Sequence, residues 1–159
     1  MPATSAGILL YRLDGASGVS VLVAHMGGPF WSRKDDGAWS IPKGEVDGDE
    51  GLLDAARREF REELGIDPPD GEYAELGTFA YSSGKRVTVF VTDGAEFTAT
   101  EFEFGTFELE WPPRSGRRQE FPEVDRVEWM SIPDARDRLV AGQRPALDRL
   151  EELLADVGA

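Results

Sequence analysis

Three glutamates in one short segment have a spacing that could bind a metal ion. Glu59, Glu62 and Glu63 are spaced i, i+3 and i+4, so on a helix they share one face. Like charges at this spacing destabilise a helix by roughly 0.2–0.5 kcal/mol per pair, which a bound cation would offset. Carboxylate ligands without His or Cys favour hard cations, so the ion would be Mg²⁺ or Mn²⁺. Taken alone, a glutamate-rich helix with neighbouring arginines is more often a solvated face.

The residues around the glutamates form a longer pattern, which favours a metal site over a solvated helix face. The segment 44–66 reads GEVDGDEGLLDAARREFREELGI. Its fixed positions are a glycine, a glutamate, an Arg-Glu pair, an apolar residue, a Glu-Glu pair, and a glycine followed by an apolar residue. The segment resembles the Nudix box at every fixed position, and a chance match in a chain of this length is on the order of one in ten million. The sequence therefore predicts a Nudix hydrolase.

The resemblance implies a metal site in this segment. Glu59, Glu62 and Glu63 correspond to the metal-binding carboxylates, and a backbone carbonyl at Lys43 or Gly44 would join them. A glycine suits a position where the backbone must approach an ion closely. Lys43 is also expected to contact a phosphate of the substrate.

Arg58 and a loop carboxylate are the other expected members of the site. Arg58 would pair with Glu50 and brace the loop against the helix. Many family members supply one further carboxylate from the loop before the final strand. Glu123 is the candidate for this role, and Glu120 and Glu128 are alternatives.

The reaction implied by the resemblance is metal-dependent cleavage of a nucleoside diphosphate linked to another moiety. Metal ions neutralise the pyrophosphate and lower the pKa of a bound water, and a glutamate takes the proton from that water. Glu59, Glu62 and Glu123 all remain open as this base.

Two features favour a dinucleoside polyphosphate as substrate. The segment 39–44, WSIPKG, resembles the approach to the box in members that cleave diadenosine polyphosphates or diphosphoinositol phosphates. Tyr81 lies 15 residues after Ile66, close to a tyrosine of dinucleoside-polyphosphate-cleaving members. An aromatic residue before the box, Trp31 or its neighbour Phe30, could stack on a base. Nucleoside triphosphates and nucleotide sugars are alternatives, as is a non-catalytic module that senses a nucleotide, although such modules tend to lose box carboxylates.

The elements that must position these residues follow from hydrophobic periodicity. A helix is expected over 51–64, because Leu53, Ala56, Phe60 and Leu64 form one apolar stripe. Asp49 would be its N-cap, and Gly65 would end it. Strands are expected at 6–13, 20–25 (after a turn at 14–18), 39–41, 74–81, 86–92, 101–111 (broken at Gly105) and 124–130. A polar loop is expected at 112–122, and helices at 133–140 and 145–154.

This order predicts one α+β domain over residues 1–159, with a mixed sheet and helices on its faces. The resemblance implies the Nudix fold, an α/β/α sandwich that combines a mixed β-sheet, the box helix and the C-terminal helices.

Composition narrows the expected partners. The formal net charge is -14, which argues against a nucleic-acid binder, and the expected partner is a small-molecule nucleotide. There is no cysteine, and no apolar stretch has the roughly 18 residues that a membrane span requires. The first residues carry no secretory signal, so the cytoplasm is the expected location. The oligomeric state stays open, and a homodimer is possible.

Overall fold

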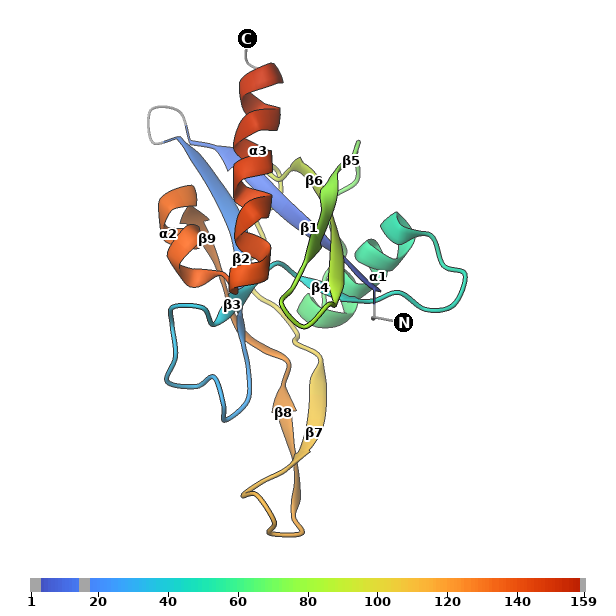
Figure 1. Ribbon diagram of the computed structural model, residues 1–159, viewed down its shortest axis with the longest axis vertical. Coiled ribbons are helices and arrows are strands. Elements are labelled where there is room, and N and C mark those ends of the chain that lie inside the picture. Colours follow the sequence, from blue (N-terminus) through green and yellow to red (C-terminus); the bar gives the residue numbers. More distant parts are fainter. Residues whose placement is uncertain (1–3, 15–17, 158–159) are drawn as a thin grey trace.

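A mixed sheet of seven strands forms the centre of the computed structural model, which describes residues 4–14 and 18–157 (Figure 1). Its strands are β1 Thr4–Leu13, β2 Val19–Met26, β3 Trp39–Ser40, β4 Lys43–Glu45, β5 Ala74–Ala80, β6 Arg86–Asp93 and β9 Val124–Ser131. A separate hairpin of β7 Thr106–Glu110 and β8 Arg118–Pro122 projects from the body. The helices are α1 Leu52–Leu64, α2 Ile132–Arg138, the short 3₁₀ helix η2 Ala141–Gln143, and α3 Arg144–Val157.

The sheet opens where β1 and β2 separate. These strands pair antiparallel only near their connection, from Tyr11↔Val21 to Leu13↔Val19. Further along, β2 pairs with β3, and β1 pairs with β4. The Ile8 N–H also donates to the Pro42 carbonyl at 3.1 Å. The segment from β3 to β4 is therefore fixed in the sheet by both neighbours, and it holds the backbone at Lys43 and Gly44 in place.

Long-range pairings complete the sheet. On its other edge, β1 runs parallel to β6, which pairs antiparallel with β5. The free edge of β2 pairs antiparallel with β9, from Ser20↔Ser131 to Met26↔Val124. The outer strands are thus β5 and β9, and the central strands β1 and β2 each have a buried middle section.

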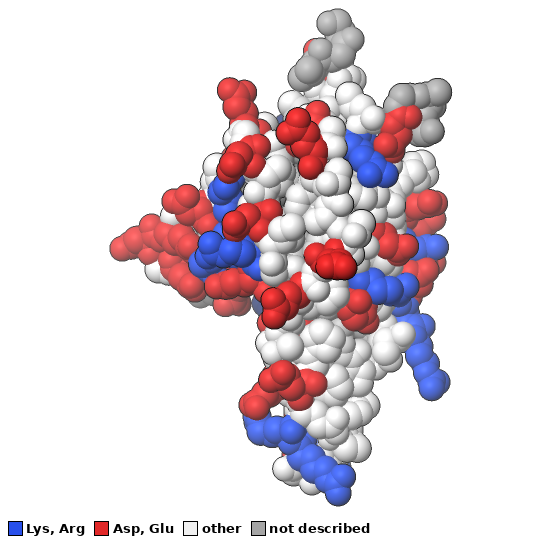
Figure 2. Space-filling model, turned by 180° about the vertical axis from the view of Figure 1, so that it is seen from behind, with Lys and Arg blue, Asp and Glu red and all other residues white. Residues whose placement is uncertain are grey.

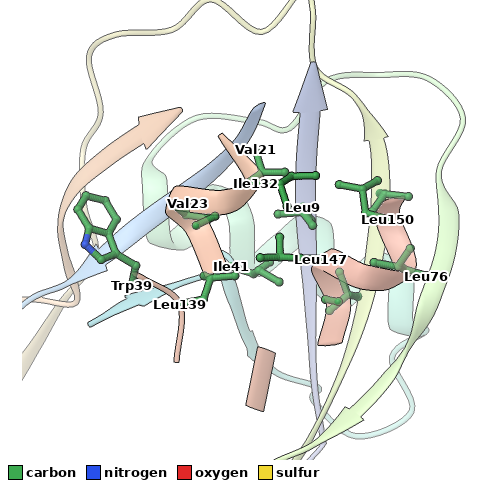
Figure 3. Packing of buried hydrophobic residues seen from close by; sticks show 14 of the residues in the cluster. Leu9, Val21, Val23, Trp39, Ile41, Leu76, Ile132, Leu139, Leu147 and Leu150 are labelled. Carbon is green, nitrogen blue, oxygen red and sulfur yellow. The ribbon is translucent and has the colours of Figure 1, made fainter. Parts of the chain in front are cut away.

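Helices cover both faces of the sheet, as predicted. Because side chains alternate along a strand, Ile8 and Leu10 of β1 face one side and Leu9 faces the other. Ile8 and Leu10 pack in a cluster with Phe60 of α1. Leu9 packs in the second cluster with residues from β2, β3, α2 and α3, shown in Figure 3. This arrangement confirms the mixed-sheet α+β sandwich.

Several sequence-based boundaries were wrong. The expected loop at 112–122 contains β8, which pairs with β7, and the expected strand at 101–111 is extended only at 106–110. The predicted N-cap Asp49 is not the cap, because α1 begins after Gly51, which makes no side-chain cap hydrogen bond. The short strand expected at 39–41 is present as β3, but the separate strand β4 after Pro42 was not predicted.

Other expectations fit the described residues or lie outside them. Gly65 ends α1 in the left-handed conformation, with φ 74°, as expected for a C-terminal glycine. Residues 15–17 of the turn expected at 14–18 lie outside the described residues. In the described part of the chain, no helix is both long and apolar enough to cross a membrane.

Candidate active site

An arginine organises the acidic face of α1. Arg58 binds both carboxylate oxygens of Glu50, through Nε at 2.9 Å and Nη2 at 2.9 Å. Its Nη1 donates to Glu59 Oε1 at 2.8 Å and to Glu62 Oε2 at 3.0 Å. Its Nη2 also donates to the Glu45 carbonyl at 3.1 Å. The expected pairing of Arg58 with Glu50 is thus present, and it ties the loop before α1 to the helix and to β4.

Contacts with Arg58 and burial shift the pKa values of the neighbouring carboxyl groups in opposite directions. The hydrogen bonds from Arg58 hold the pKa of Glu50 below its ordinary value, against a smaller opposing effect of burial. Glu59 also contacts Arg58, but burial outweighs that contact and raises the pKa of Glu59. The charges of Glu62 and Glu123 push it in the same direction. Glu59 is therefore a carboxylate held among other carboxylates and partly removed from water.

Glu63 has the most perturbed environment of these groups. The pKa of Glu63 is raised to about 8, first by burial and then by the neighbouring charges of Glu123 and Glu59, and Lys43 opposes this shift. A carboxyl group in this setting is protonated near neutral pH unless a cation joins it. Glu59, Glu63 and Glu123 thus influence one another, beside the strand that carries Lys43.

Close backbone approaches hold these elements together. A Cβ atom on Gly44 would overlap the Glu59 carboxylate, so only glycine leaves room for it there. Gly105 N–H donates to the Glu63 carbonyl at 3.3 Å, and its own carbonyl accepts from Glu123 N–H at 2.8 Å. Gly27 N–H donates to the Glu123 carbonyl at 2.9 Å. The residue that precedes β9 is thereby fixed against the end of α1.

The alternatives to Glu123 lie elsewhere. Glu120 is an exposed residue of β8 that pairs with Glu108 across the hairpin. Glu128 is an exposed residue of β9 opposite Val23, and it lines a different surface depression together with Asp35 and Arg126. Neither residue is among the charges that shift the pKa of Glu59 or Glu63.

The carboxylates have the chemistry to bind a hard divalent cation, although their oxygens do not converge on one position in this structure. Within residues 4–14 and 18–157, no three acidic or histidine side chains already form a metal-binding group. Glu62 is instead turned toward Arg58 and is 56% exposed. Every donor is an oxygen, as Mg²⁺ and Mn²⁺ prefer, and the crowding that raises the pKa of Glu63 would be relieved by a positive ion.

A pocket of about 560 Å³ adjoins this region. It contains two of the predicted substrate-binding residues, Lys43 and Tyr81, and Lys43 also acts on Glu63. The other lining residues come from four separate segments: Met26, Ser40, Ser82, Ser83, and Val140 to Gln143. Sequence reasoning did not find Gln143, because a single glutamine between two predicted helices has no distinguishing pattern.

The third predicted substrate-binding residue lies outside this pocket. Trp31 packs at the margin of the second cluster, with Lys34 Nζ 5.4 Å from its ring centroid. Its neighbour Phe30 is 57% exposed and lies edge-on to Trp111 of the β7–β8 connection, with 5.3 Å between ring centroids. Phe30 of the loop and the partly buried Trp111 of the β7–β8 connection thus form an aromatic pair at the surface.

Comparisons with known proteins agree with this fold. The family model described as NUDIX domain matches residues 1–150. Similar solved structures include the NUDIX domain of Shewanella oneidensis NrtR complexed with ADP ribose, with 16% identity over 97% of this chain and 89% of that chain and a TM-score of 0.63.

Two further structures are the MutT protein from Methanosarcina mazei Go1 and a C. elegans Ap4A hydrolase. The first has 22% identity over 96% of each chain and a TM-score of 0.62. The second has 21% identity over 97% of this chain and 98% of that chain and a TM-score of 0.56. No curated protein is significantly similar in sequence. At these identities, the likeness to solved structures establishes the fold.

Proposed function

This chain belongs to the NUDIX domain family and is a hydrolase that acts on pyrophosphate bonds, and from that premise we propose that it is a metal-dependent pyrophosphohydrolase of nucleotides. The bond cleaved joins a nucleoside diphosphate to another moiety. The observation that carries the proposal is the crowding of Glu59, Glu63 and Glu123 beside the strand of Lys43.

Each residue has a role in this reaction. Glu59, Glu62, Glu63 and the Gly44 carbonyl would hold Mg²⁺ or Mn²⁺, which supplies charge neutralisation and a more acidic bound water. Arg58 positions Glu59 and Glu62 through its hydrogen bonds.

Proton transfer and phosphate binding fall to residues outside the Arg58 network. Lys43 contacts a substrate phosphate. Glu123 is the proposed general base, because among the described residues it has no ion pair that would occupy its oxygens, whereas Glu59 and Glu62 are both bound to Arg58.

The test is a substrate panel followed by chromatography of the products. Hydrolysis of a nucleotide pyrophosphate should require Mg²⁺ or Mn²⁺, stop with excess chelator, and return when either ion is added in excess. Undiminished turnover in excess chelator would contradict the metal-dependent mechanism. Tight nucleotide binding without any hydrolysis would instead identify a sensing module.

A dinucleoside polyphosphate is the favoured substrate, and nucleoside triphosphates and nucleotide sugars are the alternatives. This choice of substrate is supported by two separate aromatic sites. Tyr81 lies in the pocket, and the Phe30–Trp111 pair lies at the surface. Two bases could use both places, whereas a nucleoside triphosphate has one base. The Ap4A hydrolase among the similar structures is consistent with a dinucleoside polyphosphate. NrtR with ADP ribose and the MutT protein are consistent with the alternative substrates.

Tyr81→Ala separates these substrates. Loss of one base contact worth about 1–3 kcal/mol should raise KM by roughly 5- to 150-fold. We expect kcat/KM to fall more for diadenosine tetraphosphate than for ATP or dGTP. Equal losses on all three, or a wild-type preference for the triphosphates, would remove the dinucleoside assignment and leave the broader one.

A further inference from the structure

A buried amide forms part of the wall of the pocket. Gln143 is fully buried. Its Oε1 accepts a hydrogen bond from the Ile41 backbone N–H at 2.8 Å, and its Nε2 donates to Ser40 Oγ at 2.9 Å and to Tyr81 Oη at 2.9 Å. The Ile41 N–H can only donate, so the amide oxygen must face it. The amide NH₂ therefore faces Ser40 and Tyr81, and the orientation of the amide is determined.

This orientation sets the direction of the Tyr81 hydrogen bond. The hydroxyl of Tyr81 uses a lone pair to accept from Gln143, so its own hydrogen must point to another group. Within the described part of the chain, that hydrogen has no acceptor. Tyr81 lines the pocket, and its ring rests against Gly142, where a Cβ atom would overlap it. The hydroxyl is therefore available to the pocket as a donor.

We propose that Gln143 is a positioning residue that makes Tyr81 a hydrogen-bond donor toward the substrate, so that the pocket selects a nucleobase edge bearing an acceptor. Such an acceptor is a ring carbonyl or an unprotonated ring nitrogen. The inference rests on the proposed function and deepens it: Tyr81 recognises the base through its hydroxyl as well as its ring. The apolar side chains of Met26, Val140 and Ala141 line the same pocket and suit the faces of a base.

The site allows the direction of this hydrogen bond to be reversed with little change in shape. In Gln143→Glu, one carboxylate oxygen can still accept from the Ile41 N–H, but the other can no longer donate to Tyr81. When this carboxyl is ionised, Tyr81 must donate to it and turns a lone pair toward the ligand. Because burial favours the protonated carboxyl, which can still donate, Gln143→Met, whose side chain has no donor, is measured in parallel. Tyr81→Phe removes the hydroxyl and keeps the ring. The two single variants and the double variant form a double-mutant cycle.

The cycle is measured with the best substrate among diadenosine tetraphosphate, ATP, dGTP and ADP-ribose. Tyr81→Phe should raise KM by about 2- to 12-fold and leave kcat unchanged, as loss of one neutral hydrogen bond implies. Gln143→Glu should raise KM by roughly 5- to 100-fold, because an acceptor then faces an acceptor. In the Tyr81→Phe background, Gln143→Glu should have almost no further effect on KM. Calorimetric affinities for whichever of AMP and GMP binds more tightly should follow the same pattern without turnover.

Controls separate positioning from a purely structural role. Glu75→Gln makes the reverse chemical change at an exposed position of β5 and should leave KM and kcat as in the wild type. If Gln143 only supports the fold, the effect of Gln143→Glu will persist in the Tyr81→Phe background, and the inference is overturned. If Gln143→Glu does not fold, Gln143→Met replaces it in the cycle with the same criterion. If the wild type hydrolyses none of the four substrates, the proposed function itself fails.

Discussion

Glu63, one of the proposed metal ligands, lowers the stability of the metal-free protein when its carboxyl group is ionised. Its pKa is raised to about 8, mainly by burial, from an ordinary value of 4.5. Between these two values, the folded state binds more protons at Glu63 than the unfolded state does. The contribution of Glu63 to the free energy of unfolding therefore falls as pH rises through this window. A bound cation would reverse the penalty, because it favours the charged carboxylate.

Glu63→Gln tests this reasoning without an activity assay. In a chelating buffer, the variant should melt at a higher temperature than the wild type at pH 8, and at nearly the same temperature at pH 4.5, where both side chains are neutral. Mg²⁺ should stabilise the wild type at pH 8 and the variant much less. Glu128→Gln, on an exposed position of β9, is the matched control. A wild type that gains stability relative to the variant between pH 5 and 8 without metal would contradict the assignment.

Arg58 is expected to affect stability and activity together. It joins Glu50, Glu59, Glu62 and the Glu45 carbonyl, and its side chain is 21% exposed. Arg58→Ala should lower the melting temperature by several degrees and kcat by roughly 10- to 100-fold, because the loop and two carboxylates lose their common partner. Thermal melts and steady-state kinetics on one preparation measure both. Lost activity with an unchanged melting temperature would mean that Arg58 contacts substrate or metal directly.

At the scale of elements, the base of the β7–β8 hairpin sets the position of Glu123. A Cβ atom on Gly105 would lie 2.9 Å from the Glu62 carbonyl oxygen, so the segment must move away from α1 if a side chain is added. Gly105→Ala should therefore displace Glu123 and reduce kcat by roughly 10-fold or more, with a smaller effect on KM. Gly51→Ala is the control, because the nearest atom to its Cβ would be at an ordinary 3.5 Å. Equal kinetics in the two variants would show that Glu123 does not depend on this contact.

Elements whose apolar residues recur at regular spacing could be predicted from the sequence. Elements whose conformation depends on pairing with another segment could not. The stripe that ends in Phe60 and Leu64 gave α1 to within a residue or two, and both side chains are fully buried. By contrast, β8 reads RQEFP, a polar segment whose extended form depends on pairing with β7. Asp49 has the right side chain for an N-cap, but the loop that holds Glu50 against Arg58 places Gly51 at that position.

The residues of the candidate site also divide into those recognisable from local spacing and those brought together only by the fold. Charged residues of the box could be named because their spacing is fixed along one helix, and Arg58 indeed meets Glu50. The role of Gln143 depends on a hydrogen bond to Ile41, 102 residues earlier in the chain. No local pattern contains that information, because it arises only when η2 packs against the strand segment near β3.

Charge acts at the scale of the whole molecule. Figure 2 shows acidic side chains spread over the surface and gathered around α1, with basic ones at the tip of the β7–β8 hairpin. With a net charge of -14, the protein as a whole repels a polyphosphate at long range. Salt screens this repulsion, since the Debye length falls from about 30 Å at 0.01 M to about 8 Å at 0.15 M.

Added NaCl at constant free Mg²⁺ should therefore raise kcat/KM for an anionic substrate, by roughly twofold or more between these salt concentrations. At saturating substrate, kcat should change little with salt, because the association of substrate with the enzyme no longer limits the rate. A fall of kcat/KM with salt would mean that local cations such as Lys43 dominate the approach of the substrate.

The pairing of β2 with β9 also determines when, during synthesis, the protein can become active. Val21 of β2 meets Met130 of β9, so the sheet cannot be completed until β9 has left the ribosome. The box helix is complete much earlier, but Glu123 reaches it only through the segment that leads into β9. A nascent chain thus carries all its box glutamates for many residues of translation before Glu123, the proposed general base, is in place. Activity is therefore expected only after β9 has been synthesised and has joined the sheet.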